Sequence, residues 1–309
     1  MKVLVTGGAG FIGHHLATAW RQRGADVVVL DNFRTGRREN VARIPGGDGF
    51  TFVEGSITDA ATVARAIDGC TIVHHLAAQV SVPESMERPA ECVEINVLGT
   101  LNVLEAARRV GAKRVVFSSS AAVYGDNPAS PKTEDMVPAP KSPYGITKLD
   151  GEYYLRMYAE SCGVPTVSLR YFNVFGPRQD PRSVYAAAVP IFLERAKAGR
   201  DLTIFGDGAQ TRDFVFVGDV VAANILAATS ANAGRGEVFN VAQGGAVTIR
   251  ELAESIRDVV GSASPIVHAA ERAGDIRHSL ASIDRIRAGL GFEARTSLRD
   301  GLRACADAV

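Results

Sequence analysis

The amino-acid sequence predicts an α/β fold: a Rossmann-type doubly wound parallel sheet with a smaller C-terminal α/β domain. In the first half of the chain, short β-branched runs alternate with amphipathic segments of helical period, which predicts a parallel sheet with helices on both faces. The first run, Lys2–Val5, leads into the glycine-rich turn Gly7–Gly13, and the first predicted helix opens on that turn. These two patterns together are typical of nucleotide-binding sheets.

The remaining elements of the first half follow the same alternation in chain order. Strands are predicted at Lys2–Val5, Asp26–Leu30, Thr51–Val53, Thr71–His74, Arg114–Phe117 and Thr166–Arg170. Helices are predicted at Phe11–Arg23, Asp59–Ile67, Glu91–Val110 and Tyr144–Cys162. Alternation of this kind implies a parallel sheet with helices on both of its faces.

The rhythm of the sequence changes after about Asn173. Gly176-Pro177 and the polar stretch that follows predict a loop. Short strands at Leu202–Ile204, Glu237–Val241 and Pro265–His268 then stand between helices, and we assign them to a smaller domain that covers the edge of the sheet. We therefore place the domain boundary between residues 173 and 174, with some later segments returning to the first domain.

Charge and composition exclude several classes of function. The chain has 309 residues, and 34 Lys and Arg balance 34 Asp and Glu, which gives no electrostatic argument for binding nucleic acid or an anionic membrane. The N-terminus enters a strand directly, and no apolar stretch approaches the roughly 20 residues of a membrane helix, so neither a signal peptide nor a membrane span is predicted. A small anionic ligand remains compatible with this composition.

The cysteine pattern predicts neither a disulfide framework nor a metal site. The four cysteines are Cys70, Cys92, Cys162 and Cys305. They are widely spaced and form no CxxC motif, so we expect reduced thiols, no bound metal and a cytoplasmic location.

The glycine-rich turn has the spacing Gly7-x-x-Gly10-x-x-Gly13. Glycines at these positions let the backbone turn tightly and approach a pyrophosphate, which the N–H groups at the start of the helix then bind. A glycine triplet alone is a weak signal. Here it follows a predicted strand and opens a predicted helix, which is the context that dinucleotide binding requires.

Asp31 directly follows the second predicted strand and comes 18 residues after Gly13. A carboxylate at this place accepts hydrogen bonds from an adenosine ribose and repels a 2′-phosphate, which favours NAD over NADP. The alternative is an ordinary helix cap or turn residue. Arg34, Arg37 and Arg38 follow closely and are able to bind a phosphate, so NADP stays open at this point.

Tyr144 and Lys148 stand four residues apart on a predicted helix and therefore share one face. A nearby ammonium favours the phenolate, and a base that works near pH 7 suits the oxidation of a hydroxyl. Lowering the phenol pKa by about 3 units corresponds to roughly 4 kcal/mol of differential interaction, which a close cation in a dry site can supply. Ser120 follows the strand at Arg114–Phe117, at the sheet edge where ligands bind. A surface pair and a turn hydroxyl are the alternatives.

With these residues in place, the chain resembles the extended short-chain dehydrogenase/reductases along nearly its whole length. Within them it is most similar to UDP-glucose and UDP-N-acetylglucosamine 4-epimerases. The matching motifs are Gly7–Gly13, Asp31-Asn32, His75–Ala78, Asn96, Ser118–Gly125, Tyr144–Lys148, Arg170–Asp180, Ile204–Gly208, Gln210–Asp213 and Arg272–Asp275. So many spaced motifs in one order make a chance match improbable.

The resemblance implies a catalytic role for three residues and a ligand for each domain. Tyr144 is implied as catalytic base and acid, Lys148 as the partner of the nicotinamide ribose that tunes Tyr144, and Ser120 as the partner of the reacting hydroxyl. Residues 1–173 then form an NAD-binding Rossmann domain, and residues 174–309 mainly a UDP-sugar-binding domain.

The contacts implied by the resemblance fall into two sets. The NAD set is Gly7, Gly10, Phe11, Ile12, Gly13, Asp31, Asn32, Phe33, Thr35, Gly36, Ser56, Ile57, Leu76, Ala77, Ala78, Gln79, Asn96, Ser118, Tyr144, Lys148, Tyr171 and Val174. The UDP-sugar set is Ser81, Val82, Ser120, Tyr144, Asn173, Ala188, Val189, Thr203, Phe205, Gln210, Arg212, Arg272, Asp275 and Ser279. Within the second set, the family places Asn173, Arg212 and Arg272 at the phosphates and Asp275 at the uridine ribose.

Two positions depart from the family pattern. Ser56 stands where relatives usually carry an aspartate that binds the adenine, so we expect a weakened adenine contact. Ala273 replaces the usual proline of the Arg-Pro-Gly-Asp loop, which should loosen that loop slightly.

The segment after Ser120 distinguishes reactions within the family. Sugar 4,6-dehydratases carry Asp-Glu there and UDP-glucuronate decarboxylases carry Glu, whereas this chain has Ala121-Ala122. Without that carboxylate, oxidation and re-reduction at C4 through a 4-keto sugar is the simplest interpretation. The alternatives are a UDP-glucuronate 4-epimerase, a decarboxylase or reductase of the same family, and, with less support, a non-catalytic NAD-binding protein.

Sugar choice and assembly are further implications of the resemblance. The small side chain of Ser279 should admit an N-acetyl group at C2, which predicts turnover of UDP-GlcNAc and UDP-GalNAc alongside UDP-glucose and UDP-galactose. The family also suggests a homodimer through a four-helix bundle. The helical residues considered for that contact are Leu98, Leu101, Leu104, Tyr154, Met157 and Tyr158, with packing inside the subunit as the alternative.

Overall fold

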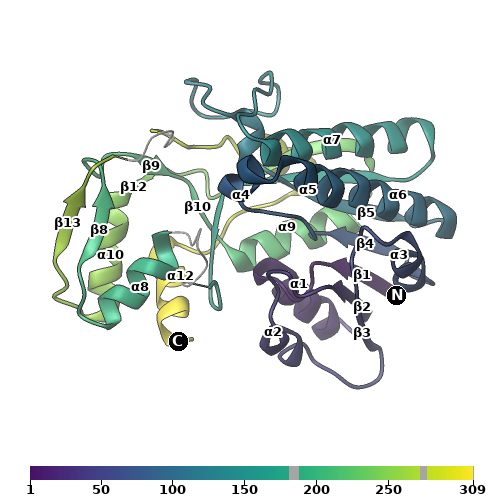
Figure 1. The fold of residues 1–309 in the computed structure, drawn as a ribbon, viewed down its shortest axis with the longest axis horizontal. Helices are drawn as coiled ribbons and strands as arrows, with labels where there is room; N and C mark the ends of the chain where they lie inside the picture. The colour runs from purple at the N-terminus through teal and green to yellow at the C-terminus, as the bar shows by residue number, and fades with distance from the viewer. Residues whose placement is uncertain (181–187, 272–276, 309) are drawn as a thin grey trace.

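Figure 1 shows the computed structural model, which describes residues 1–180, 188–271 and 277–308. A seven-stranded sheet in the order β11-β6-β5-β4-β1-β2-β3 forms its centre, and every neighbouring pair is parallel. The strands are β1 (Lys2–Thr6), β2 (Asp26–Asp31), β3 (Phe50–Glu54), β4 (Ile72–His75), β5 (Arg114–Ser120), β6 (Thr166–Tyr171) and β11 (Arg235–Val241). The chain runs from β1 outward to β3 and then crosses to β4 on the other side, which confirms the predicted doubly wound class.

Both faces of the sheet are buried, because successive side chains of a strand point to opposite faces. Val27 and Val29 of β2 lie in one apolar cluster, whereas Val28 and Leu30 lie in the other. The first cluster is covered by α1 (Phe11–Gln22), α9 (Val217–Thr229) and α11 (Asp284–Leu290). The second is covered by α3 (Ala60–Ile67), α6 (Gly99–Val110) and α7 (Pro143–Ser161), and Figure 1 shows these two layers on either side of the strands.

The long helix predicted at Glu91–Val110 is divided in the structure. It consists of α5 (Pro89–Val93), the π-helical turn η1 (Glu94–Leu98) and α6, and the short helix α4 (Val82–Glu87) precedes them. Asn96 lies in the π-helical turn, and its side chain bonds the backbone of Gln79 and the hydroxyl of Thr147. A π-helical turn changes the direction of a side chain within a helix. Hydrophobic periodicity did not predict the turn, because the three hydrogen bonds join residues that are distant in the sequence.

The C-terminal elements form a smaller group beside the large sheet, at the left of Figure 1. Its strands are β7 (Asn173–Phe175), β8 (Leu202–Phe205), β9 (Thr211–Arg212), β10 (Phe214–Phe216), β12 (Val247–Thr248) and β13 (Ile266–Ala269), paired as β10-β7, β12-β9 and β13-β8. Helices α8 (Ala188–Lys197), α10 (Ile249–Val260) and α12 (Leu298–Asp307) bury a separate core among them. Across the described ranges, no helix is long and apolar enough to span a bilayer.

The assignment of Glu237–Val241 to the smaller group is wrong. This run lies within β11, which pairs in parallel with β6 as the edge strand of the large sheet. Helix α9 packs against β5 and β6 and returns the chain to that edge as a crossover. Because a crossover of this kind is set by packing far along the sequence, the local pattern of β11 carries no sign of its partner.

Candidate functional site

A pocket of about 800 Å³ opens at the carboxyl ends of the central strands, beside β1, where the strand order reverses. Most of the NAD set predicted from the sequence lines it. These residues are Gly7, Gly10, Phe11, Ile12, Gly13, Asp31, Asn32, Thr35, Gly36, Ser56, Ile57, Leu76, Ala77, Ala78, Ser118, Tyr144, Lys148, Tyr171 and Val174, and Ser120 joins them. The tertiary structure therefore brings together segments from β1, β2, β4, β5, β6 and α7.

The glycine turn lines the pocket, and its positions require glycine because a side chain there would collide with the neighbouring backbone. Gly7 has a φ of +71°, and a Cβ added to it would lie 2.7 Å from the backbone nitrogen of Ala77. A Cβ on Gly13 would overlap the carbonyl oxygen of Gly7. Helix α1 begins at Phe11 with Gly10 as its cap. The N–H groups of its first turn lack intrahelical acceptors, which suits a diphosphate.

Asp31 is fixed at the end of β2 by two backbone donors. Its Oδ2 accepts a hydrogen bond from the N–H of Ala9 at 3.0 Å, and its Oδ1 accepts one from Phe33 at 2.8 Å. Burial raises the pKa of this carboxyl group, and the two hydrogen bonds oppose that effect. Asp31 also lines the pocket.

The three arginines that left NADP open all carry ion pairs. Arg34 pairs with Glu84 and Glu91, Arg37 with Asp180, and Arg38 with Glu54. Their charges are therefore balanced by carboxylates of this chain.

Tyr144, Ser120 and Lys148 meet at the inner end of the pocket. Burial raises the pKa of the Tyr144 phenol above its ordinary value, although the Ser120 side chain opposes this effect. The lowered pKa expected from the sequence is therefore wrong for this structure, because burial of the phenol outweighs the neighbouring groups. The Lys148 ammonium lies 5.8 Å from the centre of the Tyr144 ring and donates to the carbonyl oxygen of Ser118 at 2.7 Å. Burial lowers the pKa of Lys148 to about 8. A hydroxyl, a phenol and an ammonium therefore line the same part of the pocket, where such groups can exchange a proton with a bound hydroxyl.

Three successive residues of β5 are tied to successive turns of α7. The Ser118 carbonyl accepts from Lys148, the Ser119 hydroxyl donates to Glu152 at 2.5 Å, and the Ser120 side chain is near enough to Tyr144 to lower the pKa of its phenol. Glu152 in turn accepts two hydrogen bonds from Arg170 of β6, at 2.8 and 2.7 Å. Since Tyr144, Lys148 and Glu152 follow at spacings of four, one face of α7 fixes the end of the strand.

Three residues of the NAD set lie outside the pocket lining. Asn96 is behind the wall, where its Oδ1 accepts from the N–H of Gln79 at 2.7 Å and its amide donates to the Gln79 carbonyl at 3.0 Å. Phe33 stacks on Phe52 with ring centres 5.1 Å apart. These three residues are not among those that line the pocket, so their predicted contacts with NAD stay predictions.

The weakened adenine contact expected at Ser56 agrees with the hydrogen bonds that its hydroxyl makes in the structure. The Ser56 hydroxyl is 2.8 Å from the Thr58 hydroxyl and accepts from the Thr58 N–H at 3.2 Å. Its hydrogen-bonding capacity is therefore used partly within its own turn.

The UDP-sugar set is distributed over both parts of the chain. Ser120 and Tyr144 line the pocket, and Ser81 and Val82 begin α4 beside it. The C-terminal members are Asn173, Ala188, Val189, Thr203, Phe205, Gln210, Arg212 and Ser279. Arg272, Asp275 and the Ala273 departure lie outside the described residues.

Some contacts within the C-terminal set are defined. The Ser279 N–H donates to the Thr211 carbonyl at 3.1 Å, which places Ser279 beside Arg212. Gln210 donates to the Phe205 carbonyl at 2.7 Å. Val189, in contrast, is 1% exposed and packs in the core of the smaller group.

Several lining residues were missed from the sequence. They are Leu30, Gly55, Val80, Ile95, Ser119, Phe172, Gln179 and Asp180. Arg34 and Arg37 also line the pocket, although the sequence offered them only as alternative phosphate ligands. Gln179 and Asp180 belong to a polar loop, and nothing local indicates that this loop folds back on the first glycine turn.

A model of the NAD dependent epimerase/dehydratase family matches residues 3–242. This chain belongs to that family. It is 42% identical to a UDP-glucose 4-epimerase of Mycolicibacterium smegmatis over 304 residues, which cover 98% of this chain and 96% of that protein. The family membership confirms the predicted resemblance.

Two solved structures of this family superpose closely on the chain. A UDP-glucose 4-epimerase of Thermus thermophilus in complex with NAD is 40% identical, has a TM-score of 0.89, and aligns over 100% of this chain and 98% of its own. A UDP-N-acetylglucosamine 4-epimerase of Methanobrevibacter ruminantium, in complex with UDP-N-acetylmuramic acid, is 39% identical with a TM-score of 0.94 and coverage of 99% and 97%.

NAD is the cofactor of this family member, and the pocket fits it. The glycine turn offers backbone N–H groups where side chains would collide. Among the described residues, the Oε1 of Gln179 is buried in the pocket wall without a hydrogen-bond partner, which calls for a polar ligand.

Proposed function

We propose that this enzyme is a UDP-hexose 4-epimerase that interconverts UDP-glucose and UDP-galactose, and UDP-GlcNAc and UDP-GalNAc, through a 4-keto sugar. The observation that carries the proposal is the convergence of Ser120, Tyr144 and Lys148 at the inner end of the pocket. The residues after Ser120, Ala121-Ala122, begin the 3-10 turn η2 (Ala121–Tyr124) and bring no carboxylate. Elimination and decarboxylation lose support for that reason.

In the proposed reaction, NAD supplies the hydride acceptor and returns the hydride. Tyr144 takes the proton of the C4 hydroxyl while Ser120 holds that oxygen by a hydrogen bond. Lys148 stabilises the phenolate by its charge. The 4-keto sugar then turns on its diphosphate tether, and Tyr144 returns the proton to the oxygen when hydride is delivered to the opposite face. Proton and hydride both return to the sugar, so the reaction has no net oxidation.

The residues around this centre supply binding. We assign the N–H groups at the start of α1 to the NAD diphosphate, Asp31 to the adenosine ribose, and Lys148 to the nicotinamide ribose. Asn173 and Arg212 are assigned to the UDP phosphates, because amide and guanidinium groups donate to phosphate oxygens.

Ser279 is proposed to admit acetylated sugars. It lies next to Arg212 through its backbone contact with Thr211, so it is close to the expected phosphate position. A Ser279→Tyr variant should lose most activity on UDP-GlcNAc while it keeps activity on UDP-glucose. Equal activity of the variant on both sugars would show that Ser279 does not determine which sugar is accepted.

The test of the function is to incubate the purified enzyme separately with UDP-glucose, UDP-GlcNAc and UDP-glucuronic acid and to resolve the epimers by proton NMR. We expect conversion of the first two to their C4 epimers, with no released carbon dioxide and no net NADH. Conversion of the uronic acid alone, or a decarboxylated product, would overturn the proposal.

We also propose a homodimer formed through α5, η1, α6 and α7. Leu98 is 52% exposed and Tyr153 is 56% exposed on these helices. Two residues considered from the sequence, Leu104 and Tyr158, are instead buried inside the subunit, because α6 and α7 use those faces against the sheet. A Leu98→Glu/Tyr153→Glu variant should therefore be monomeric by light scattering, and an unchanged mass would contradict this surface.

A further inference from the structure

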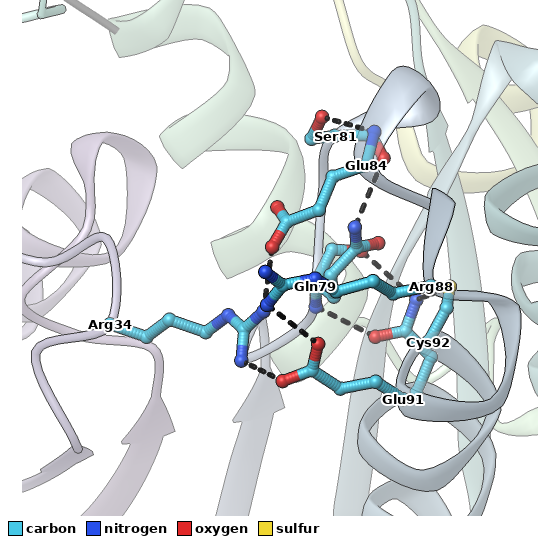
Figure 2. A network of polar contacts seen from close by, with 8 residues as sticks. Arg34, Gln79, Ser81, Glu84, Arg88, Glu91 and Cys92 are labelled. Carbon is cyan, nitrogen blue, oxygen red and sulfur yellow. Dashed lines mark hydrogen bonds and ion pairs between the residues drawn. The ribbon is translucent and has the colours of Figure 1, made fainter. Parts of the chain in front are cut away.

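The Arg34 side chain joins two segments on opposite sides of the pocket mouth. It extends from the loop after β2 and donates to Glu84 of α4 at 2.7 Å and to Glu91 of α5 at 2.5 Å (Figure 2). Arg34 itself lines the pocket, whereas the two carboxylates belong to the helices that follow β4. A single guanidinium thus binds two carboxylates that the sequence places 50 and 57 residues away.

The strand order shows what this connection crosses. Strand β1 lies between β2 and β4 in the sheet. A side chain that runs from the loop after β2 to the helices after β4 therefore passes the carboxyl end of β1. That end carries the turn Gly7–Gly13, where we place the diphosphate of NAD.

On the far side, the start of α4, which carries Glu84, is fixed by hydrogen bonds. The backbone N–H of Glu84 donates to the Ser81 hydroxyl at 3.1 Å, and the Gln79 amide donates to the Ser81 carbonyl at 3.1 Å. Glu91 also pairs with Arg88 at 3.6 Å. Figure 2 shows these residues as one network, so Arg34 meets an ordered acceptor rather than two independent side chains.

We propose that Arg34, Glu84 and Glu91 form a clasp across the mouth of the cofactor pocket that slows the release of NAD. This inference rests on the placement of NAD in this pocket. The three side chains are 31%, 28% and 33% exposed, so salt screens their attraction and the clasp opens more often at high ionic strength. Arg34 acts as a positioning residue that holds the rim closed, and the catalytic groups lie deeper.

A different role for Arg34 predicts the opposite result for its partners. If Arg34 instead bound the NAD diphosphate directly, Glu84 and Glu91 would compete with the phosphate for its charge. Removal of both carboxylates would then slow NAD release. In a clasp, removal of either side accelerates release.

The experiment measures the rate at which NAD leaves the purified holoenzyme after dilution into an NAD-consuming trap. We expect Arg34→Gln and Glu84→Gln/Glu91→Gln to release NAD roughly two- to thirtyfold faster than the unaltered protein, the range for loss of two exposed ion pairs. Salt at about 0.5 M should accelerate release from the unaltered protein and leave both variants nearly unchanged.

Arg38→Gln is the matched control. It removes an arginine four residues away, whose pair with Glu54 is 71% and 56% exposed and whose side chain is outside the pocket lining. Its release rate should equal that of the unaltered protein. Unchanged or slower release from Glu84→Gln/Glu91→Gln would overturn the clasp. Because NAD release requires no turnover, a protein that passes this test and lacks epimerase activity would refute the proposed function alone.

Discussion

The inner end and the rim of the cofactor pocket are built from the same kinds of side chain in opposite surroundings. Behind the inner end, beyond the residues that line the pocket, Glu152 and Arg170 form an ion pair that is 3% and 4% exposed. At the rim, Arg34 pairs with Glu84 and Glu91 at about the same distances, but about a third of each side chain faces solvent. Ion pairs of similar length therefore have different physical consequences when their burial differs.

The difference in burial separates two tasks. A buried charge that loses its partner is strongly destabilising, so the inner pair fixes the strand end that carries Ser120 and tolerates no opening. An exposed pair contributes little energy and is screened by salt, so the rim pair can open while the fold stays intact. The inner end thus determines the chemistry, whereas the rim controls exchange of the cofactor.

The largest expected effect is at the phenol. Tyr144→Phe removes the group that exchanges the proton, so kcat for epimerisation should fall by about 10²- to 10⁴-fold. NAD release should stay within twofold, because Phe keeps the ring that lines the pocket. Steady-state assays and the trapping experiment measure the two quantities separately. A variant with full turnover would show that another residue is the base.

The next effect is on stability, at the pair beneath the catalytic residues. Glu152→Gln leaves the Arg170 charge buried without its partner and should lower the free energy of unfolding by about 3–5 kcal/mol. Arg34→Gln at the rim should cost about 1 kcal/mol or less. Urea denaturation of both variants tests the contrast directly, and equal losses would contradict it.

An apolar replacement of the whole inner pair provides the control. Glu152→Leu/Arg170→Met should recover much of the stability lost in Glu152→Gln, because neither charge then remains buried. No recovery would show that leaving the Ser119 hydroxyl without its acceptor costs as much as the unpaired charge.

A pH-dependent effect, which is smaller for each residue over one pH unit, comes from four histidines that burial keeps neutral. Burial lowers the pKa of His14, His74 and His75 to about 3 and that of His15 to about 4. The unfolded chain binds protons below about pH 6.5 while the folded chain does not, so stability falls as pH decreases from about 6.5 toward 4. Each histidine contributes at most about 1.4 kcal/mol per pH unit.

Melting temperatures at pH 5 and 7.5 measure this dependence. His14→Gln should reduce the acid sensitivity, and His268→Gln, at an exposed position, is the matched control. High salt should reproduce the faster NAD release of the rim variants without this loss of stability. If His14→Gln loses as much melting temperature at pH 5 as the unaltered protein, groups other than His14 cause the acid sensitivity.

The sequence predicted most of the pocket that β1, β2 and β5 provide. Gly7–Gly13 and Asp31 could be identified because tight turns and strand ends require particular residues at short spacings. Tyr144 and Lys148 could be placed on one face because a helix repeats within four residues. The locations of Gln179, Asp180 and the wall residue Asn96 could not, since they depend on loops that meet only in the folded chain.

By itself, the sequence determined the family, the α/β class and the chemical groups at the reaction centre, because these depend on local periodicity and on motifs of a few residues. Only the tertiary structure decided that β11 completes the sheet, that Glu152 and Arg170 brace the catalytic strand, and that Arg34 spans the pocket mouth. Each of these contacts joins residues that are distant in the chain. Their partners are selected by crossover topology and packing, which leave no trace in local spacing.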